Sequence, residues 1–384
     1  MPDSEAISPM RVEVTDDVLD DLRTRLRATL WPDAAPGAPW EYGTDLTYLR
    51  DLCEYWADGY DWRAAEQRLN TFDHFTTTID GQNIHFVHAP SPEPDAEPLV
   101  ITHGWPGSVV EFLDVIGPLS NPVSYGGDAA DAFHVVAPSI PGYAWSGPTT
   151  EPGWDSRRVA EAWATLMDRL GYTRYSAQGG DWGSLITTEL GLVDSAHLTG
   201  IHLNMAVCGP PANGGEMTDA ETAAFARVTD YLENGSGYAA IQGTKPQTLS
   251  YGLTDSPAGL AGWILEKFHA WTDHEGNLET AVGRDDLLTN LMTYWVTGTI
   301  NSSTRLYYES KKAGRLGPVD ERVEVPTAVA RYPYEILTSP RSWLEAAFNL
   351  RRVADMPRGG HFAAFEEPDL FVADVREAFA DLRS

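Results

Sequence analysis

Seven residues decide the fold of this chain: Gln178-Gly179-Gly180-Asp181-Trp182-Gly183-Ser184. Strand-forming residues from Tyr172 to Ser176 precede them, and a helical pattern from Leu185 to Leu192 follows. Small residues around one acidic residue at a strand-to-helix junction are typical of a nucleophile elbow. In that motif a tight turn presents one side chain at the top of a parallel sheet.

The central residue of the elbow is Asp181, a carboxylate rather than a hydroxyl. Gly179 and Gly183 lie two residues to either side, where a side chain would obstruct the turn or the helix packing. A carboxylate nucleophile attacks an sp3 carbon and leaves an alkyl ester on the enzyme. This chemistry opens an epoxide or displaces a halide, whereas serine would indicate acyl transfer. The plainer alternative is a glycine-rich turn in which Asp181 caps a helix.

Length and charge limit the function classes. A chain of 384 residues predicts one large α/β domain with an inserted or appended part. The net charge of −29 argues against nucleic acid and anionic membranes as partners. Cys53 and Cys208 lack metal-ligand spacing, which favours a reducing cytoplasm. Neither a signal peptide in Met1–Met10 nor a membrane anchor is expected. The preference for arginine over lysine indicates a bacterial source.

Residues 1–90 predict a helical strap followed by a hairpin. Apolar residues at helical spacing predict helices over Thr15–Leu30, Asp45–Tyr60 and Trp62–Leu69. Alternating runs on both sides of Asp80-Gly81 predict two antiparallel strands. This region carries no catalytic cluster, so we expect it to pack across a larger domain.

Residues 91–209 and 315–384 alternate strands with helices, which is typical of a parallel sheet. The predicted strands are the one before the elbow, Leu99–Thr102, Phe133–Ala137, Ile201–Asn204, Val325–Ala330 and Leu350–Ala354. The predicted helices are Val109–Ile116, Val159–Leu170 and Pro368–Leu382. The alternation stops between Pro210 and Gly314, where aromatic and leucine-rich helical patterns predict an inserted cap, residues 210–314.

Three candidate side chains follow strands in the order Asp181, Glu335, His361. Nucleophile, acid and then histidine is the chain order of the α/β-hydrolase triad. Loops after parallel strands share one edge of the sheet, where sites form. His361 would activate water, and Glu335 would orient its imidazole. Each residue alone is as compatible with a structural role, but the ordered trio predicts an α/β-hydrolase fold.

Ester hydrolysis passes through an oxyanion that needs preorganised N–H donors. The amide of Trp182, directly after the nucleophile, is one candidate, and the amide of Trp105 in His103-Gly104-Trp105-Pro106 is the other. An ordinary Gly-Pro turn is the alternative for the second segment. Epoxide opening also needs an acid at the departing oxygen, and a neutral tyrosine suits this role. Composition alone does not choose among the cap tyrosines, which are Tyr231, Tyr238, Tyr251, Tyr294, Tyr307 and Tyr308.

Nearly the whole chain resembles the microsomal-type epoxide hydrolases. The matching words are His103–Gly107, the Gly179–Ser184 elbow, Ile241–Pro246, Asp255–Pro257, Leu265–Phe268, Tyr294-Trp295, Thr297–Thr299, Ser302-Ser303, Arg305 and Arg358–Pro368. The Trp-rich N-terminal part is similar to the strap of that family. The membrane anchor of the mammalian members is missing, consistent with a soluble bacterial member.

The resemblance implies a role for each candidate residue. Asp181 is the nucleophile, Glu335 the orienting acid and His361 the base. Tyr307 and Tyr238 match the two cap tyrosines that bind the epoxide oxygen. Tyr308 stands where the family often has lysine, so Tyr307 and Tyr308 both stay open as the proton donor.

The sequence therefore predicts an epoxide hydrolase that forms a vicinal diol from an epoxide and water, without metal or organic cofactor. A haloalkane dehalogenase, an idle hydrolase-fold binding protein and a serine esterase using Ser184 are the alternatives. The aromatic cap favours a bulky apolar or aromatic epoxide. A role in polyketide or enediyne biosynthesis is a further hypothesis. The oligomeric state stays open, a homodimer included.

Overall fold

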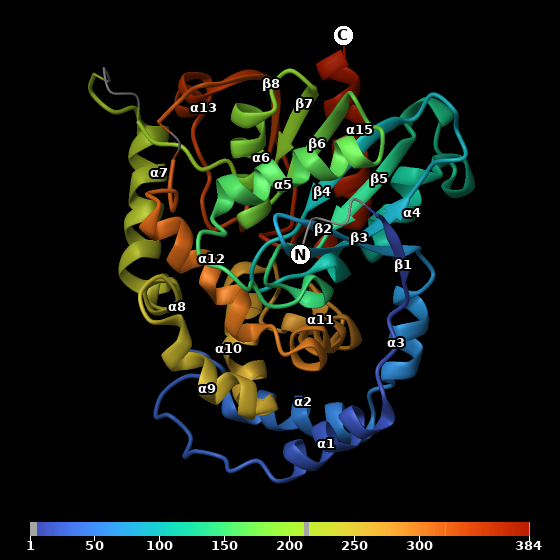
Figure 1. Cartoon of the computed structure of the whole chain (residues 1–384). Coiled ribbons are helices and arrows are strands. Elements are labelled where there is room, and N and C mark those ends of the chain that lie inside the picture. Colours follow the sequence, from blue (N-terminus) through green and yellow to red (C-terminus); the bar gives the residue numbers. More distant parts are fainter. Residues whose placement is uncertain (1–5, 211–214, 319, 384) are drawn as a thin grey trace.

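The computed structural model describes residues 6–210, 215–318 and 320–383 (Figure 1). Residues 1–5 of the N-terminal segment Met1–Met10, and 211–214 of the predicted cap, lie outside the described residues. No helix in the described part of the chain has both the length and the apolar content needed to cross a bilayer.

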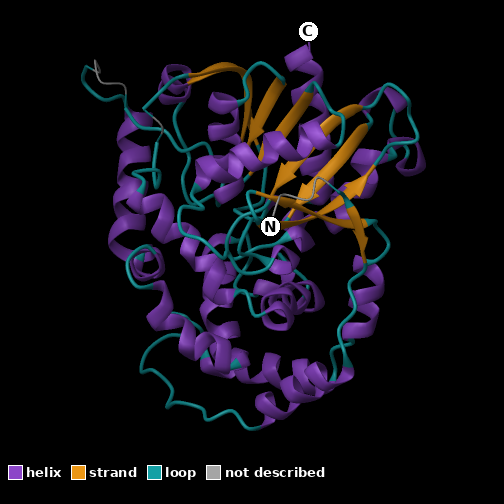
Figure 2. Cartoon of the chain, in the orientation of Figure 1, coloured by secondary structure: helices purple, strands orange, loops and turns teal. Residues whose placement is uncertain are grey.

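The described residues form a nine-stranded sheet in the order β1-β2-β3-β5-β4-β6-β7-β8-β9 (Figure 2). Its strands are β1 (Ser8–Met10), β2 (His74–Ile79), β3 (Gln82–Ala89), β4 (Glu97–Thr102), β5 (Phe133–Pro138), β6 (Tyr175–Gly179), β7 (Leu198–Leu203), β8 (Val323–Arg331) and β9 (Phe348–Asp355). The six strands from β5 to β9 are mutually parallel, and β1, β2 and β3 pair antiparallel at one edge. The predicted hairpin at Asp80-Gly81 and the predicted parallel sheet are confirmed.

Alternation along β4 builds a core on both faces of the sheet. Val100 joins the core beneath α5 (Ser156–Arg169) and α6 (Trp182–Val193). Leu99 and Ile101 join the second core, beneath α4 (Leu113–Ser120) and α15 (Pro368–Arg383). Side chains of a strand alternate between faces, so a short apolar run supplies both cores. Two further short helices are α13 (Arg341–Ala347) and α14 (Ala363–Glu366).

Several predicted boundaries were wrong by a few residues, including the ends of the first strap helix and the start of the elbow helix, and two others have a clear local cause. The elbow strand begins at Tyr175 rather than Tyr172, because the Tyr172 amide closes the end of α5 by donating to Met167 O at 3.0 Å. The helix predicted over Val109–Ile116 starts as a 3-10 turn, η1 (Val109–Phe112), and α4 continues it to Ser120. The Ser108 hydroxyl accepts from the Val110 amide, which caps this tighter turn.

The cap and the strap lie beyond the carboxyl ends of the parallel strands (Figure 1). The cap comprises α7 (Asp219–Asp230), α8 (Gly237–Gln242), α9 (Pro246–Asp255), α10 (Pro257–Trp271), α11 (Arg284–Thr297) and α12 (Ile300–Lys312). The strap comprises α1 (Asp16–Arg27), α2 (Leu46–Asp58) and α3 (Trp62–Leu69). The blue strap helices α1 and α2 run across the outer side of the cap in Figure 1. All three predicted strap helices are confirmed.

Polar contacts fasten the strap to the cap. The Trp56 indole N–H donates to the sulfur of Met292 at 3.3 Å, within the buried core. The hydroxyls of Tyr60 and Thr289 lie 2.9 Å apart. Because β1 and β2 continue the same strap into the sheet, one chain segment joins the cap to the sheet edge.

Candidate active site

Asp181 lies at the sharp turn between β6 and α6. Its φ of +50° is in the region that non-glycine residues rarely adopt, so the turn is strained. A Cβ on Gly183 would lie 1.9 Å from Thr102 O, and a Cβ on Gly179 would lie 2.1 Å from Gly183 O. The predicted need for glycine at both positions is confirmed, since any side chain there would push the helix off the sheet.

The loop after β4 approaches the Asp181 carboxylate closely. The Trp105 amide donates to Asp181 Oδ1 at 2.8 Å. A Cβ on Gly104 would lie 2.3 Å from the same oxygen, so only glycine permits this approach. The Trp182 amide, the other predicted donor, is the first of α6 and has no carbonyl partner within its own helix. His103 has a different role, because its Nε2 accepts from the Ile140 amide.

Glu335 and His361 lie on loops after β8 and β9, and a parallel bridge between Tyr334 and Gly360 holds those loops side by side. His361 Nδ1 lies 2.6 Å from Glu335 Oε1, and its Nε2 lies 3.3 Å from Asp181 Oδ2. The structure thus brings together all three residues of the predicted triad. Burial opposes the charged imidazole, but the Glu335 and Asp181 carboxylates raise the pKa of His361 well above its ordinary value.

A cavity of about 290 Å³ lies over Asp181, between the elbow and the cap. Tyr238 of α8 and Tyr307 of α12 both line it, together with Tyr231. Tyr308 is 39% exposed and does not line this cavity, which leaves Tyr307 as the one facing the carboxylate. The other two cap tyrosines point elsewhere: Tyr294 donates to Gly107 O, and Tyr251 is exposed.

Aromatic contacts hold the two tyrosines in place. The Tyr307 ring meets the Trp182 ring edge to face at 4.7 Å between centroids, and Tyr238 stacks on Trp105 at 5.2 Å. The residues that carry the two candidate oxyanion amides therefore also position the two phenols. Burial raises the pKa of both tyrosines well above the ordinary value, so both phenols are neutral donors near neutral pH.

Two protein-family models match the chain. Residues 7–112 match the family model described as epoxide hydrolase N terminus, and residues 97–235 match the alpha/beta hydrolase fold. The chain is 38% identical to epoxide hydrolase 1 of Sus scrofa, over 98% of this chain and 89% of that protein. The chain belongs to the epoxide hydrolase family.

Solved structures of two family members have the same architecture. The juvenile hormone epoxide hydrolase of Bombyx mori is 34% identical, with a TM-score of 0.85 over 99% of this chain and 95% of that one. The epoxide hydrolase of Aspergillus niger is 31% identical, with a TM-score of 0.87 over 99% and 97% of the two chains. The enzyme therefore shares strap, sheet and cap with its relatives along nearly its whole length.

Beyond its polar floor, the cavity of this epoxide hydrolase is mainly apolar. Its aliphatic wall comes from the elbow helix, the loop after β7, the cap and the loop before α13. The aliphatic residues are Leu185, Met205, Val207, Leu232, Ala239, Ala240, Leu316 and Leu337. Lys311 is the one cationic residue among the described residues that line it.

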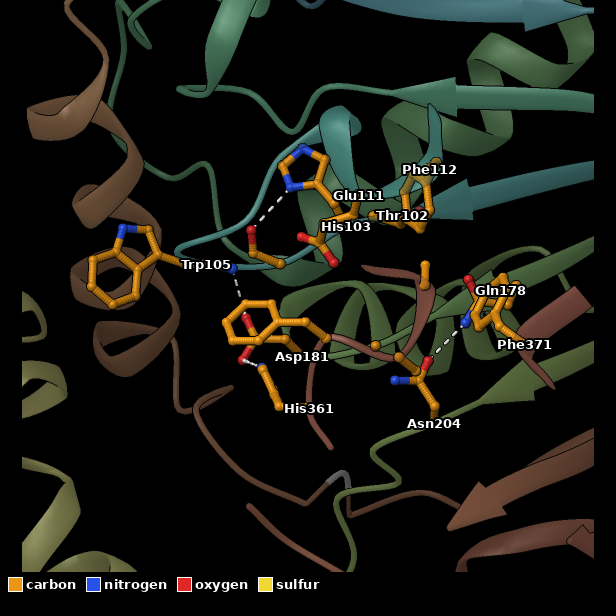
Figure 3. Close-up of a pocket in the computed structure, with 15 residues that line it drawn as sticks. Thr102, His103, Trp105, Glu111, Phe112, Gln178, Asp181, Asn204, His361 and Phe371 are labelled. Atoms are coloured by element: carbon orange, nitrogen blue, oxygen red, sulfur yellow. Dashed lines mark hydrogen bonds and ion pairs between the residues drawn. The ribbon is translucent and has the colours of Figure 1, made fainter. Parts of the chain in front are cut away.

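Sequence reasoning missed three polar residues beside the site. Glu111 and Gln178 line a second, small cavity that also touches Asp181 and His361 (Figure 3). Lys267 is buried, and its ammonium lies 4.6 Å from the centre of the Tyr238 ring. The sequence gives one signal for Glu111, an acidic residue inside the apolar run Val109–Leu113. Gln178 and Lys267 lie within motifs that were already recognised, without a mark of their own.

Proposed function

We propose that the enzyme opens a bulky apolar or aromatic epoxide to a vicinal diol through a covalent ester on Asp181. The observation that carries the proposal is that the carboxylate and the phenols of Tyr238 and Tyr307 line one cavity. A ring opened between these groups is attacked on carbon from one side and protonated on oxygen from the other.

In the first half-reaction Asp181 Oδ2 attacks a ring carbon, while Oδ1 stays on the Trp105 amide. The C–O bond of the ring breaks, and the developing alkoxide takes a proton from a phenol of Tyr238 or Tyr307. The phenolate recovers its proton from the protonated imidazole of His361. The products are a hydroxyalkyl ester, two neutral phenols and a neutral imidazole.

Ester formation prepares His361 for the second half-reaction. It removes the negative charge of Asp181, one of the two charges that raise the pKa of His361. The neutral imidazole, still bonded to Glu335, takes a proton from a water molecule that attacks the ester carbon. The resulting oxyanion is held by the Trp105 and Trp182 amides. Collapse of the oxyanion breaks the ester C–O bond, and the departing diol oxygen takes the proton that remains on the added hydroxyl. The diol is released, and the Asp181 carboxylate is restored beside the imidazolium.

Two substitutions test this assignment. Asp181→Asn should abolish diol formation, because it removes the nucleophile. His361→Gln should stop at the ester, which adds the mass of one substrate molecule to the protein. Intact-protein mass spectrometry after incubation with styrene oxide measures both. Normal turnover by His361→Gln, or no adduct on it, would contradict the mechanism.

Halide release from a chloroalkane serves as the control for the alternative chemistry of this fold. Both chemistries use an aspartate nucleophile, but only epoxide opening needs a proton donor at the departing oxygen. Tyr307→Phe should therefore slow diol formation by at least about tenfold. An unchanged rate of diol formation would remove Tyr307 from the mechanism.

A further inference from the structure

A second cavity, of about 20 Å³, shares Asp181 with the larger cavity beneath the cap but is otherwise lined by different residues. It is lined by residues from the loop after β4, η1, β6, the loop after β7 and the His361 loop (Figure 3). A space of this volume admits one water molecule, which needs two to four polar partners. Both Asp181 and His361 line this cavity.

Two fully buried oxygens among the lining residues lack a protein partner. Glu111 Oε1 and Gln178 Oε1 make no hydrogen bond within the described part of the chain. The Gln178 amide nitrogen is already committed, because it donates to Asn204 Oδ1 at 2.8 Å. A buried polar atom without a partner costs about 1–3 kcal/mol, so two such atoms around one small cavity point to a ligand between them.

The fold makes room for the Glu111 carboxyl. A Cβ on Gly107 would lie 1.5 Å from Glu111 Oε1, so the Glu111 carboxyl occupies the space that a side chain at position 107 would take. In Figure 3 the Glu111 carboxyl lies on the Asp181 side of the loop that carries His103 and Trp105. Burial is the largest influence on Glu111 and raises its pKa to about 8, with Asp181 also raising it and His361 lowering it. Glu111 is therefore a neutral acid, able to donate, at neutral pH.

We propose that this small cavity holds the water that hydrolyses the ester, and that Glu111 and Gln178 are its positioning residues. The proposal rests on the ester mechanism above. The water donates one hydrogen to His361 Nε2 and the other to Gln178 Oε1. It accepts from the Glu111 hydroxyl, which leaves a lone pair for the ester carbon.

The donor count explains why the acid must be neutral. Three acceptors around one water would compete for its two hydrogens, and an ionised Glu111 would be a third acceptor. A protonated Glu111 supplies the missing donor. The proton that the water loses goes to His361, so Glu111 keeps its own proton throughout. The titratable groups that act on Glu111 are His361 and Asp181, and Tyr294 is close enough for Glu111 to raise its pKa. His103 lines the same cavity, and all four side chains are buried or half-buried.

The test separates the two half-reactions by single-turnover mass spectrometry with styrene oxide. Glu111→Met fills the space without a donor and should form the ester within about threefold of the wild-type rate. Ester decay should be at least about tenfold slower, since one hydrogen bond to the attacking water is lost. Glu111→Gln keeps an N–H donor and should restore decay to within about threefold of wild type.

The pH profile of ester decay adds a measurement that a purely structural role would not change. Wild-type decay should fall on the alkaline side as the buried Glu111 ionises, and Glu111→Gln should lack this fall. If Glu111→Met does not fold, the profile of Glu111→Gln decides alone. A fall identical to wild type would overturn the proposal.

The matched control is Glu189→Gln, which removes a different buried carboxylate. Glu189 lies on the elbow helix α6 and pairs with Arg157. This substitution should leave the ratio of the rate constants for ester formation and ester decay unchanged. Glu111→Met would overturn the water site if it decayed at the wild-type rate or slowed both steps equally. An absence of ester on His361→Gln would instead overturn the ester mechanism itself, so the two failures are distinguishable.

Discussion

The Asp181 carboxylate is surrounded by atoms that come close only because glycine occupies the neighbouring positions. Gly104 admits the Trp105 amide, and Gly107 admits the Glu111 carboxyl. The price of this crowding is a second acid buried beside the proposed nucleophile. The enzyme tolerates it because burial keeps Glu111 protonated, which avoids two negative charges in one dry space.

The buried acid makes stability depend on pH. The pKa of Glu111 rises from 4.5 to about 8 on folding, so its contribution is fully present below about pH 4.5 and is lost as pH rises through 8. Glu111→Gln does not ionise. The difference in free energy of unfolding between Glu111→Gln and wild type should therefore rise in favour of the variant by up to about 1.4 kcal/mol per pH unit between about pH 4.5 and pH 8. Above about pH 8 this difference should stay constant.

Urea unfolding of both proteins at several pH values measures this difference, and the other titrating groups cancel. A constant difference across the range would show that Glu111 titrates normally in the folded enzyme. If the free energy of unfolding of Glu111→Gln relative to wild type rose as the pH fell, Glu111 would be ionised in the folded enzyme, the opposite of the charge state inferred here.

At the scale of elements, the cap holds the loops of the candidate active site as well as covering them. Tyr294 of α11 donates to Gly107 O at 2.6 Å, and Asn290 of α11 donates to Pro106 O at 2.8 Å. At the end of α10, Trp271 O accepts from the His361 amide at 2.9 Å. Both the loop that supplies Trp105 and the loop that supplies His361 are thus fixed by cap helices.

Removing one of these anchors should affect both stability and rate. Tyr294→Phe leaves the buried Gly107 carbonyl without its donor and should lower the free energy of unfolding by about 1–3 kcal/mol. Diol formation should slow as well, because the Trp105 amide loses its fixed position. Denaturant unfolding and steady-state kinetics measure the two effects.

Tyr251→Phe is the matched control for that prediction, because Tyr251 is a cap tyrosine with an exposed side chain. It should leave both quantities unchanged. Equal results for the two variants would mean that α11 merely covers the loop.

At the scale of the whole molecule, the excess of acidic residues should make the fold sensitive to salt. The net charge of −29 produces self-repulsion in the compact state. Raising NaCl from about 10 mM to about 200 mM shortens the screening length from about 30 Å to below 10 Å. The midpoint of thermal unfolding should rise, and scanning calorimetry at pH 7 measures it. A falling midpoint would mean that the surface ion pairs outweigh the repulsion.

The sequence predicted the sheet, the strap, the cap and the triad because each has a local pattern. The elbow at Asp181 is marked by its glycines, and His361 by its place after the last strand. The sequence could not show which side chains from remote segments lie close together in the fold. Choosing Tyr307 over Tyr308 needed the rotation of α12, since adjacent helical residues face different directions.

Glu111 shows the same limit more sharply. Its charge state depends on burial among segments that are some seventy to two hundred and fifty residues away in the chain. No local pattern records such an environment. The predicted start of the strand before the elbow was wrong for a similar reason. Tyr172, which was expected to begin that strand, instead donates its amide to the end of α5, and the strand begins at Tyr175.

The strap across the cap limits how a substrate can enter the cavity. Trp56 and Tyr60 bind the strap to α11, and β2 of the same segment is paired within the sheet. A rigid-body opening of the cap would therefore have to break the contacts between the strap and the cap. An epoxide therefore has to fit the cavity that Leu232 and Lys311 help to line without a large movement of the cap. We expect epoxides that are too large for this cavity to be excluded from the enzyme.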